Sequence, residues 1–389
     1  MRFLAYIFIL VLTLILVRTS NAAEPKVPDR ELAIWCEFMP YEEVQEALPL
    51  LARYNCGLLL HVERETLKDD SFLKLCGAAK QHGVNLTAWF LLPPEEHLYL
   101  GEGSIEEMIS LTHAFLDWAE AQGHPFQRVV FDCEPSYMLG QQMLVQVKTK
   151  SPRGLSRLLK EQVDPARFTE SARRIEEMVA GLQERGVEVQ GTANRVFLDF
   201  VRFRNVTAQD VMNAPFTMIP WDRVSFITYR YKASRAAYRA MVSHYAKGAV
   251  AAFGDKATLD VGLLGDHRRI RAFRDRALGF GAEEFYLSFL AGMRDPQELA
   301  EAMGMGLDKG LRRFNLFSLD GAVASDAGLE AWLQAAATAP VRKHSGSTPL
   351  HGLKLRMSLR AQAFLFHLFA GHAKYDLPVL PEPETPSEE

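Results

Sequence analysis

Several features that would assign a protein class at once are scarce or missing in this 389-residue sequence. Four cysteines are too few for a fold held together by disulfides. No segment repeats at a collagen, heptad or solenoid period. The one long apolar run covers residues 3–17, which excludes a membrane protein with several spans. The formal charge is −4, and because phosphate binding needs a basic footprint, nucleic acid is not expected as a partner.

The composition that remains is that of a globular protein, with 48% hydrophobic and 24% charged residues. Its N-terminus has a basic Arg2, the apolar run 3–17 and small residues at Ser20 and Ala22. This order is typical of a signal peptide, predicted over 1–22, so we expect a secreted or periplasmic protein. An uncleaved N-terminal membrane anchor is the alternative, although the run is short for a span of about 20 residues.

Apolar runs of strand length alternate with amphipathic helical stretches over most of the chain. The nine strand candidates are residues 32–38, 57–63, 84–92, 128–134, 187–194, 223–230, 257–264, 283–290 and 312–320. This alternation predicts an α/β fold of parallel strands, a (β/α)8 TIM-type barrel with an extra strand or insertion. Because eight strands close a barrel, either 283–290 or 312–320 should lie outside it. An open doubly wound sheet is the alternative, but the turn "FMPYEE" after the first strand lacks the usual glycines.

Composition also divides the chain into segments. The predicted order is a signal peptide (1–22), the barrel domain (23–339), a linker (340–350), a C-terminal amphipathic helix (351–375) and a disordered acidic tail (376–389). The basic-then-apolar stretch 352–373 would either make peripheral contact with a membrane or pack on the barrel.

Helix signals and one long connection refine the barrel domain. Ser104 with Glu107 forms a capping-box pattern, and Asp164–Pro165 and Asp295–Pro296 are further predicted helix starts. Residues 135–163, after the fourth strand, are too long for a plain turn. We expect them to overhang the strand ends as a lid or groove wall.

Polar side chains gather late in the predicted strands, where parallel barrels carry their function. Residues i and i+2 of a strand share a face, so several polar residues should point inward together. The expected inward set is Trp35, Glu37, His61, Glu63, Asp132, Glu134, Asn194, Tyr229 and Asp320. With Arg230 and Trp89 at neighbouring strand ends, it predicts an acidic, hydroxyl-bearing pocket. The aromatic residues would either offer platforms to sugar rings or pack in the core.

Asp132 and Glu134 are the strongest candidates for chemistry. An isolated acid late in a strand more often caps a helix or pairs with an arginine, which applies to Glu37, Glu63 and Asp320. Two acids on one face of an apolar strand instead repel each other and lose water, so they are rarely kept without a use. Paired carboxylates suit glycoside cleavage, because a neighbouring charge keeps one acid protonated near neutral pH.

Four segments resemble the motifs of family-18 chitinases and their relatives. They are "FDCEPS" (131–136), "FITYRY" (226–231), "LDVGLLG" (259–265) and "FSLDG" (317–321). The resemblance implies a carbohydrate substrate, with Glu134 protonating the leaving oxygen. It further implies that Asp132 orients an acetamide group, that Tyr229 hydrogen-bonds it, and that the acetamide oxygen is the nucleophile. The sequence differs from the family pattern at Val130, Arg230 and Phe317.

Other functions fit parts of the same pattern. A conventional retaining glycosidase would pair Glu134 with Glu37, Glu63, Asp266 or Asp320. A metal-dependent hydrolase would use His61, Glu63, Asp132 and His267, but His-x-His and His-Glu-x-x-His are absent. A non-catalytic carbohydrate-binding or scaffold protein is favoured by Arg195 and Arg230, which would ionise the acid that must donate a proton. A cysteine hydrolase through Cys133 is disfavoured because that side chain should face the helices. No metal and no cofactor is expected.

The four cysteines leave two arrangements open. Cys56 starts the second strand and Cys76 lies late in the following helix, so both belong near the bottom of the barrel, and a bridge is sterically reasonable. Cys36 and Cys133 should be buried thiols. The alternative is four reduced cysteines in the core.

Overall fold

A computed structural model describes residues 30–93, 98–201, 206–230, 234–265 and 292–343. The predicted signal peptide, C-terminal helix and acidic tail lie outside the described residues, as do the strand candidate 283–290 and the site candidates Asp266 and His267. Of the predicted linker, residues 340–343 are described, and Arg342 donates its backbone N–H to the Gly304 carbonyl at 3.0 Å. This part of the linker therefore packs against the helix Pro296–Asp308.

Eight parallel strands form a closed barrel in chain order. They are β1 (Glu31–Cys36), β2 (Cys56–Val62), β3 (Leu86–Phe90), β4 (Arg128–Cys133), β5 (Glu188–Asn194), β6 (Arg223–Tyr229), β7 (Ala257–Gly262) and β8 (Arg313–Phe317). Each strand pairs with the next, and β8 closes on β1 with Leu32 opposite Phe314. The chain is therefore a (β/α)8 TIM barrel, as predicted, and the candidate 312–320 supplies its closing strand.

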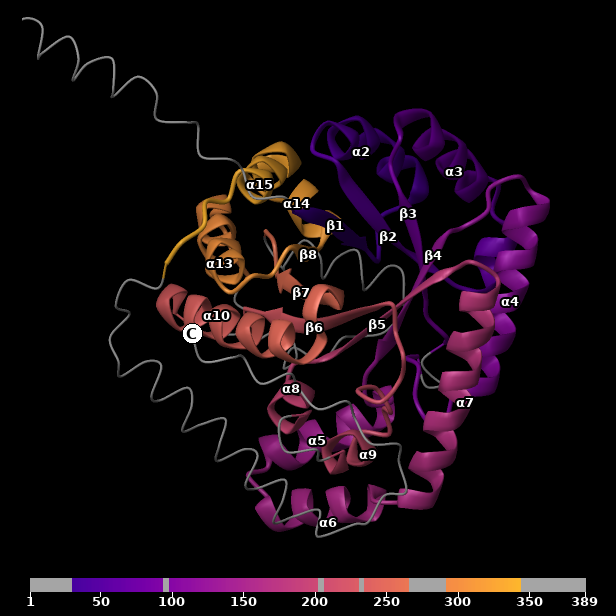
Figure 1. The fold of residues 1–389 in the computed structure, drawn as a ribbon, viewed down its shortest axis with the longest axis vertical. Helices are drawn as coiled ribbons and strands as arrows, with labels where there is room; N and C mark the ends of the chain where they lie inside the picture. The colour runs from indigo at the N-terminus through magenta and orange to yellow at the C-terminus, as the bar shows by residue number, and fades with distance from the viewer. Residues whose placement is uncertain (1–29, 94–97, 202–205, 231–233, 266–291, 344–389) are drawn as a thin grey trace, which may run out of the picture.

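Helices surround the barrel (Figure 1). They are α2 (Tyr41–Arg53), α3 (Asp70–His82), α4 (Ile105–Ala121), α5 (Tyr137–Lys148), α6 (Pro152–Gln162), α7 (Pro165–Glu184), α8 (Val196–Val201), α9 (Thr207–Val211), α10 (Arg235–Phe253), α13 (Pro296–Asp308), α14 (Leu319–Val323) and α15 (Gly328–Ala337), with short 3-10 turns η1 (Arg64–Lys68) and η3 (Gly254–Lys256). Within the described ranges, none of these helices has the length and apolar character needed to span a bilayer.

The long connection after β4 forms two helices, α5 and α6. They lie together with α8 and α9 at one end of the molecule (Figure 1). Leu159 of α6 and Val211 of α9 form the centre of a small apolar cluster there, to which Met143 of α5 contributes. Because α5 follows the carboxyl end of β4, this group is an insertion on the side of the barrel where the strands end.

Two of the three predicted helix starts have the expected caps. The carboxylates of Asp164 and Asp295 accept backbone N–H groups in the first turns of α7 and α13, each with proline at the first helical position. The capping box at Ser104 is wrong, although α4 begins there. The Ser104 hydroxyl instead accepts the Gly101 N–H at 2.9 Å and donates to the Tyr99 carbonyl at 2.6 Å, so it folds the loop before α4.

Strand parity divides the apolar side chains between two cores. The larger lies between the strands and the helices and contains Phe131 and Cys133. The smaller lies inside the barrel and consists of Trp35, Leu59, Trp89, Leu91 and Val130. Phe131 and Val130 are neighbours in β4 yet belong to different cores, which confirms the predicted facing of that strand.

An ionic network crosses the amino-terminal end of the barrel interior. Glu31 of β1 accepts bonds from Arg223 of β6, and from Arg128 of β4 and Arg313 of β8 at 3.2 Å each. Glu188 of β5 accepts bonds from Arg128 at 2.7 Å and from Arg223. Although burial alone would raise it, the pKa of Glu31 is held below its usual value, chiefly by hydrogen bonding to Arg223. The network therefore ties five strands together at this end.

We predict that Glu31→Gln lowers the free energy of unfolding by about 1–2 kcal/mol, because it weakens three partly exposed ion pairs that are worth up to about 1 kcal/mol each. Urea denaturation at pH 7 measures the loss, which should shrink in 1 M NaCl because salt screens the pairs. Glu330→Gln, which breaks the exposed pair with Arg53, is the matched control and should change stability by less than about 0.5 kcal/mol. An equal loss in both variants would contradict the network's role.

All four cysteines are free thiols and all are buried. The bridge between Cys56 and Cys76 is thus not formed, and the Cys56 thiol instead contacts the Gly57 carbonyl at 3.5 Å. Burial raises the pKa of Cys36, Cys56, Cys76 and Cys133 above that of an exposed thiol, which makes the thiolate scarce.

Thiol titration of denatured, unreduced protein should therefore find four reactive groups per chain. The native protein should react slowly, because its thiols are buried and protonated. Two thiols in the denatured sample would show that a bridge forms after all.

Candidate active site

Two carboxylates mark the carboxyl end of β4. Asp132 lies inside the barrel and is 8% exposed, and its Oδ1 atom is buried without a hydrogen-bond partner among the described residues. Glu134 follows directly after the strand and is half-buried. The backbone carbonyl of Asp132 accepts the Leu100 N–H at 2.9 Å, which fixes the β3–α4 loop beside this strand end.

A third carboxylate, Asp260 of β7, was not predicted. It is fully buried, and its Oδ1 accepts bonds from Asn315 Nδ2 of β8 at 2.6 Å, Ser225 Oγ of β6 at 2.7 Å and Trp35 Nε1 of β1 at 3.3 Å. Its Oδ2 atom is buried and has no partner in the described part of the chain. The one available signal was a single acid in the otherwise apolar strand "ATLDVG", on the same face as Thr258.

The three carboxylates act on one another. Burial raises the pKa of Glu134 to about 7, the charge of Asp260 adds to the rise, and the Arg195 guanidinium opposes it. Burial likewise raises the pKa of Asp260 to about 6, against the effect of its three hydrogen-bond donors. The pKa of Asp132 is raised well above its usual value by burial, then by the charges of Glu134, Asp260 and Glu37. The site therefore holds protonated and ionised carboxyl groups together near neutral pH.

Trp35 and Trp89 lie inside the barrel beneath this group. They are 2% and 3% exposed and pack edge to face with ring centroids 4.8 Å apart. The expectation that they present ring faces to a sugar is therefore wrong, because the barrel core covers those faces. Two half-buried rings lie nearer the mouth, Tyr229 of β6 and Phe317 of β8, with centroids 4.8 Å apart.

Glu37 and Asp320 meet at the end of β1. The Asp320 carboxylate, at the start of α14, accepts the backbone N–H groups of Phe38 at 2.9 Å and Glu37 at 3.3 Å. Asp320 is 1% exposed, so it holds the β1–α2 loop in place and offers no surface to a substrate. Glu37, half-buried, remains close enough to Asp132 to raise the pKa of that carboxyl.

Three predicted ligand-binding residues have structural partners away from the carboxylates. Glu63 is exposed and caps η1 through a reciprocal capping box with Thr66. Arg230 forms an ion pair with Glu298 of α13, so it lies between the barrel and its outer helices. Asn194 accepts the Val196 N–H at 3.1 Å and closes the turn after β5. In each case a backbone group or a residue of another helix supplies the polar partner of the side chain. The spacing of residues in the sequence does not reveal such partners.

His61 packs against an aromatic ring inside the barrel. Its half-buried side chain lies beside Trp89, with ring centroids 5.9 Å apart. Loss of hydration there lowers its pKa to about 4, so it is neutral at physiological pH. In the part of the chain that the structure describes, no group of three His, Cys, Asp or Glu side chains is arranged to hold a metal ion.

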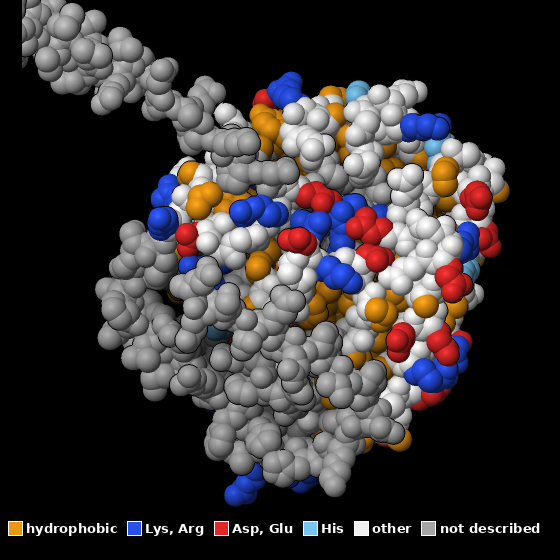
Figure 2. Space-filling model, viewed as in Figure 1, with side chains coloured by type: hydrophobic (Ala, Val, Ile, Leu, Met, Phe, Trp, Pro, Cys, Tyr) orange, Lys and Arg blue, Asp and Glu red, His pale blue; other side chains and the backbone are white. Residues whose placement is uncertain are grey.

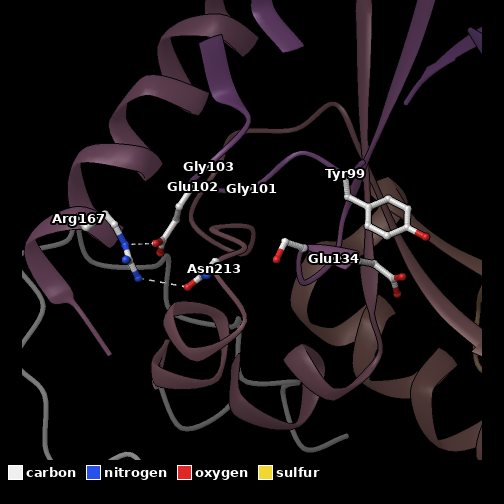
Figure 3. A pocket seen from close by; sticks show the side chains of 8 residues that line it. Tyr99, Gly101, Glu102, Gly103, Glu134, Arg167 and Asn213 are labelled. Carbon is white, nitrogen blue, oxygen red and sulfur yellow. Dashed lines mark hydrogen bonds and ion pairs between the residues drawn. The ribbon is translucent and has the colours of Figure 1, made fainter. Parts of the chain in front are cut away.

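A cavity of about 170 Å³ opens next to Glu134 (Figure 3). It is lined by Tyr99, Gly101, Glu102, Gly103, Glu134, Ser136, Arg167 and Asn213. Figure 3 shows the Glu134 carboxylate pointing away from Glu102 and Arg167, on the side of the Tyr99 ring. Gly101 is required in this wall, because a Cβ there would lie 2.7 Å from the Asn213 carbonyl oxygen.

The far wall of the cavity is an ion pair. Arg167 of α7 binds the Glu102 carboxylate and donates to Asn213 Oδ1 at 3.2 Å (Figure 3). The Glu102 side chain is 2% exposed, and burial raises its pKa to about 7 despite the charge of Arg167. This pair joins the loop before α4 to α7 and so gives the cavity a fixed wall. Over the face drawn in Figure 2, acidic and basic side chains are interspersed across the described surface.

No protein-family model matches the sequence, and no curated protein matches it. The structure is similar to solved TIM barrels of several activities. A GH18 chitinase from Pseudoalteromonas aurantia aligns over 79% of this chain and 99% of its own, with 8% identity and a TM-score of 0.43. The C-terminal domain of a putative chitinase from Desulfitobacterium hafniense DCB-2 aligns over 81% and 100%, with 10% identity and a TM-score of 0.47. A D-psicose 3-epimerase aligns over 88% and 100%, with 12% identity and a TM-score of 0.39. These likenesses concern the barrel alone.

We predict that the Asp132→Asn variant loses less stability than the wild type as the pH rises. The folded-state pKa of Asp132 is raised, so between about pH 4 and that pKa the folded protein binds more protons than the unfolded chain. Stability therefore falls as pH rises through this window, by about 1.4 kcal/mol for each pH unit. Asparagine cannot ionise, so the variant should lose at least about 1 kcal/mol less than the wild type between pH 5 and 8 in urea titrations. Stability curves that run parallel in the variant and the wild type would contradict the raised pKa of Asp132.

Proposed function

We propose that this protein is a glycoside hydrolase in which Glu134 is the general acid. The observation that carries the proposal is a half-buried carboxyl at the carboxyl end of β4 whose pKa is raised to about 7 by burial and by Asp260. A glycosidic oxygen is a poor leaving group unless it is protonated as the bond breaks. An acid with a pKa near the working pH is suited to that transfer, because it is protonated before the step and gives up its proton readily.

The groups around Glu134 have complementary roles in this proposal. Asp132 stays neutral inside the barrel and hydrogen-bonds a polar substituent of the sugar, such as an acetamide. Tyr229, at the mouth, hydrogen-bonds the same substituent. The oxocarbenium-like transition state develops positive charge on the sugar ring, and ionised Asp260 and Glu37 would stabilise it electrostatically.

The nucleophile is either the substrate's own acetamide oxygen or a carboxylate of another strand. Asp320 binds backbone N–H groups of the β1–α2 loop, and Glu63 caps the turn η1, so both are poorly placed for covalent attack. Glu37 and Asp260 are the two carboxylates from other strands whose charges act on the β4 pair. A substrate that lacks an N-acetyl group yet is hydrolysed would favour a carboxylate nucleophile.

A non-catalytic carbohydrate-binding protein is the second candidate. Arg195, next to Asn194 at the end of β5, lowers the pKa of Glu134 and thus favours the form that cannot donate a proton. In this alternative the carboxylates would accept hydrogen bonds from sugar hydroxyls without cleavage. The absence of turnover in a protein that binds a glycan would select it.

We predict that Glu134→Gln lowers kcat about 10²–10⁴-fold, because glutamine keeps the shape of the side chain and cannot donate a proton. Release of reducing ends is measured on a panel of polysaccharides with and without N-acetyl groups. Wild-type activity should fall as pH rises above about 7, where Glu134 ionises.

The control for this experiment is Glu63→Gln, since the structure places Glu63 in the η1 cap and outside the carboxylate group. Its turnover should match that of the wild type. Undiminished turnover in Glu134→Gln would remove Glu134 as the acid, and equal losses in both variants would show a general effect of removing charge.

A further inference from the structure

The cavity beside Glu134 has a carboxylate in its wall that is only half used. Glu102, in the loop before α4, binds Arg167 through Oε2. Its other oxygen, Oε1, is buried and has no hydrogen-bond partner among the described residues, and the whole side chain is 2% exposed. Burying a carboxylate oxygen without a donor costs free energy. The cavity that Glu102 lines is the adjacent space from which a ligand could supply that donor.

The same wall offers a donor next to this acceptor. Arg167 donates Nε to Glu102, and it donates Nη2 to the Gln162 carbonyl at 3.0 Å and to Asn213 Oδ1 at 3.2 Å (Figure 3). Within the described part of the chain its Nη1 group makes no hydrogen bond, and the side chain is 45% exposed. The wall therefore combines one acceptor and one cationic donor that are both available to a ligand.

Hydrogen bonds hold this wall in one arrangement. The Asn213 carbonyl accepts the Glu102 N–H at 2.9 Å, and Asn213 Nδ2 donates to Gln162 Oε1 at 3.3 Å. Asn213 itself has a φ of 55°, a left-handed backbone that asparagine tolerates better than most residues. Because Glu102, Arg167 and Asn213 are fixed by one another and by Gln162, a ligand would not have to order them on binding.

The size and chemistry of the cavity select the kind of ligand. Its volume is about 170 Å³, and a cavity of about 150 Å³ is large enough for a six-membered ring. The acceptor beside a donor matches hydroxyl groups on neighbouring ring carbons, one of which donates to Glu102 Oε1 while the other accepts from Arg167 Nη1. A ring that carries a carboxylate would also meet the like charge of Glu102, which disfavours it.

We propose that this cavity is a binding subsite for an uncharged sugar ring, which Glu102 and Arg167 hold through two neighbouring hydroxyl groups. Glu134 lines the same cavity, but its carboxylate points away from Glu102 and Arg167 (Figure 3). The ring bound here is therefore a neighbour of the ring at which cleavage would occur. This inference deepens the proposed function, on which it rests for the choice of a carbohydrate.

The test measures binding without cleavage. Cellotetraose and chitotetraose, the tetramers of glucose and N-acetylglucosamine, are titrated by calorimetry into the full-length protein carrying Glu134→Gln. Adding Glu102→Gln should raise Kd about 10- to 100-fold, because a hydrogen bond to a charged acceptor is lost. Failure of both tetramers to bind, or a Kd that changes less than about twofold, would overturn the proposal.

Glu106→Gln is the matched control. Glu106 pairs with Arg174 at 2.6 Å and so joins the same two helices, α4 and α7, outside the cavity. This change should leave Kd within about twofold of its value in the parent protein. An equal loss in Glu102→Gln and Glu106→Gln would overturn the proposal, since it would show a general effect of loosening α4 from α7.

Two further measurements keep the result clear of indirect effects. Arg167→Lys keeps a positive charge beside Glu102 and removes the guanidinium fork, so it should weaken binding even if Glu102→Gln does not fold. Unchanged binding in Arg167→Lys would contradict the subsite. Tetragalacturonate serves as an acidic probe, and tighter binding of it after Glu102→Gln would identify Arg167 as an anion site and overturn the choice of an uncharged ring.

The outcomes separate this inference from the proposed function. If Glu102→Gln weakens binding and Glu134→Gln still hydrolyses polysaccharide, the subsite stands and the catalytic role of Glu134 fails. If turnover depends on Glu134 but Kd does not respond to Glu102, the reverse holds. Where turnover is found, Glu102→Gln with Glu134 intact should raise KM and change kcat less than about threefold. A damaged fold would instead lower kcat, because fewer molecules would be active.

Discussion

The two-residue alternation of eight parallel strands is the constraint on which the rest of the structure depends. In β4 it assigns Phe131 and Cys133 to the helix-facing core and Val130 and Asp132 to the barrel interior. Closure of the sheet then brings inward residues of all eight strands into a space too narrow for water to follow freely. A polar side chain placed there must find partners from other strands, and the consequences differ at the two ends of the barrel.

At the amino-terminal end the charges are matched. Glu31 and Glu188 are surrounded by three arginines, and their ion pairs tie five strands together. At the carboxyl end acids predominate, and the donors to Asp260 are neutral. The first arrangement favours stability, whereas the second raises the pKa of buried acids and weakens the fold as pH rises. Buried acids with raised pKa values cluster at functional sites, which is why this end is the candidate site.

Much of the fold could be predicted from the sequence, because its signals are local. Apolar runs of strand length marked all eight strands, and proline after aspartate marked the starts of α7 and α13. The site was only partly predictable. Parity correctly placed Asp132 inside. It could not show that Asp320 binds the β1 loop, that Arg230 pairs with Glu298, or that Trp35 and Trp89 pack edge to face in the barrel interior. Those outcomes depend on partners far away in the chain.

Asp260 shows why the missing part matters most. In the sequence it is one acid in an apolar strand, with nothing next to it to suggest a role. Its meaning comes from Ser225, Asn315 and Trp35, which lie 35, 55 and 225 positions away and meet only after closure of the barrel. A search for paired acids along one strand therefore finds Asp132 and Glu134 and misses Asp260, whose hydrogen-bond partners come from three other strands.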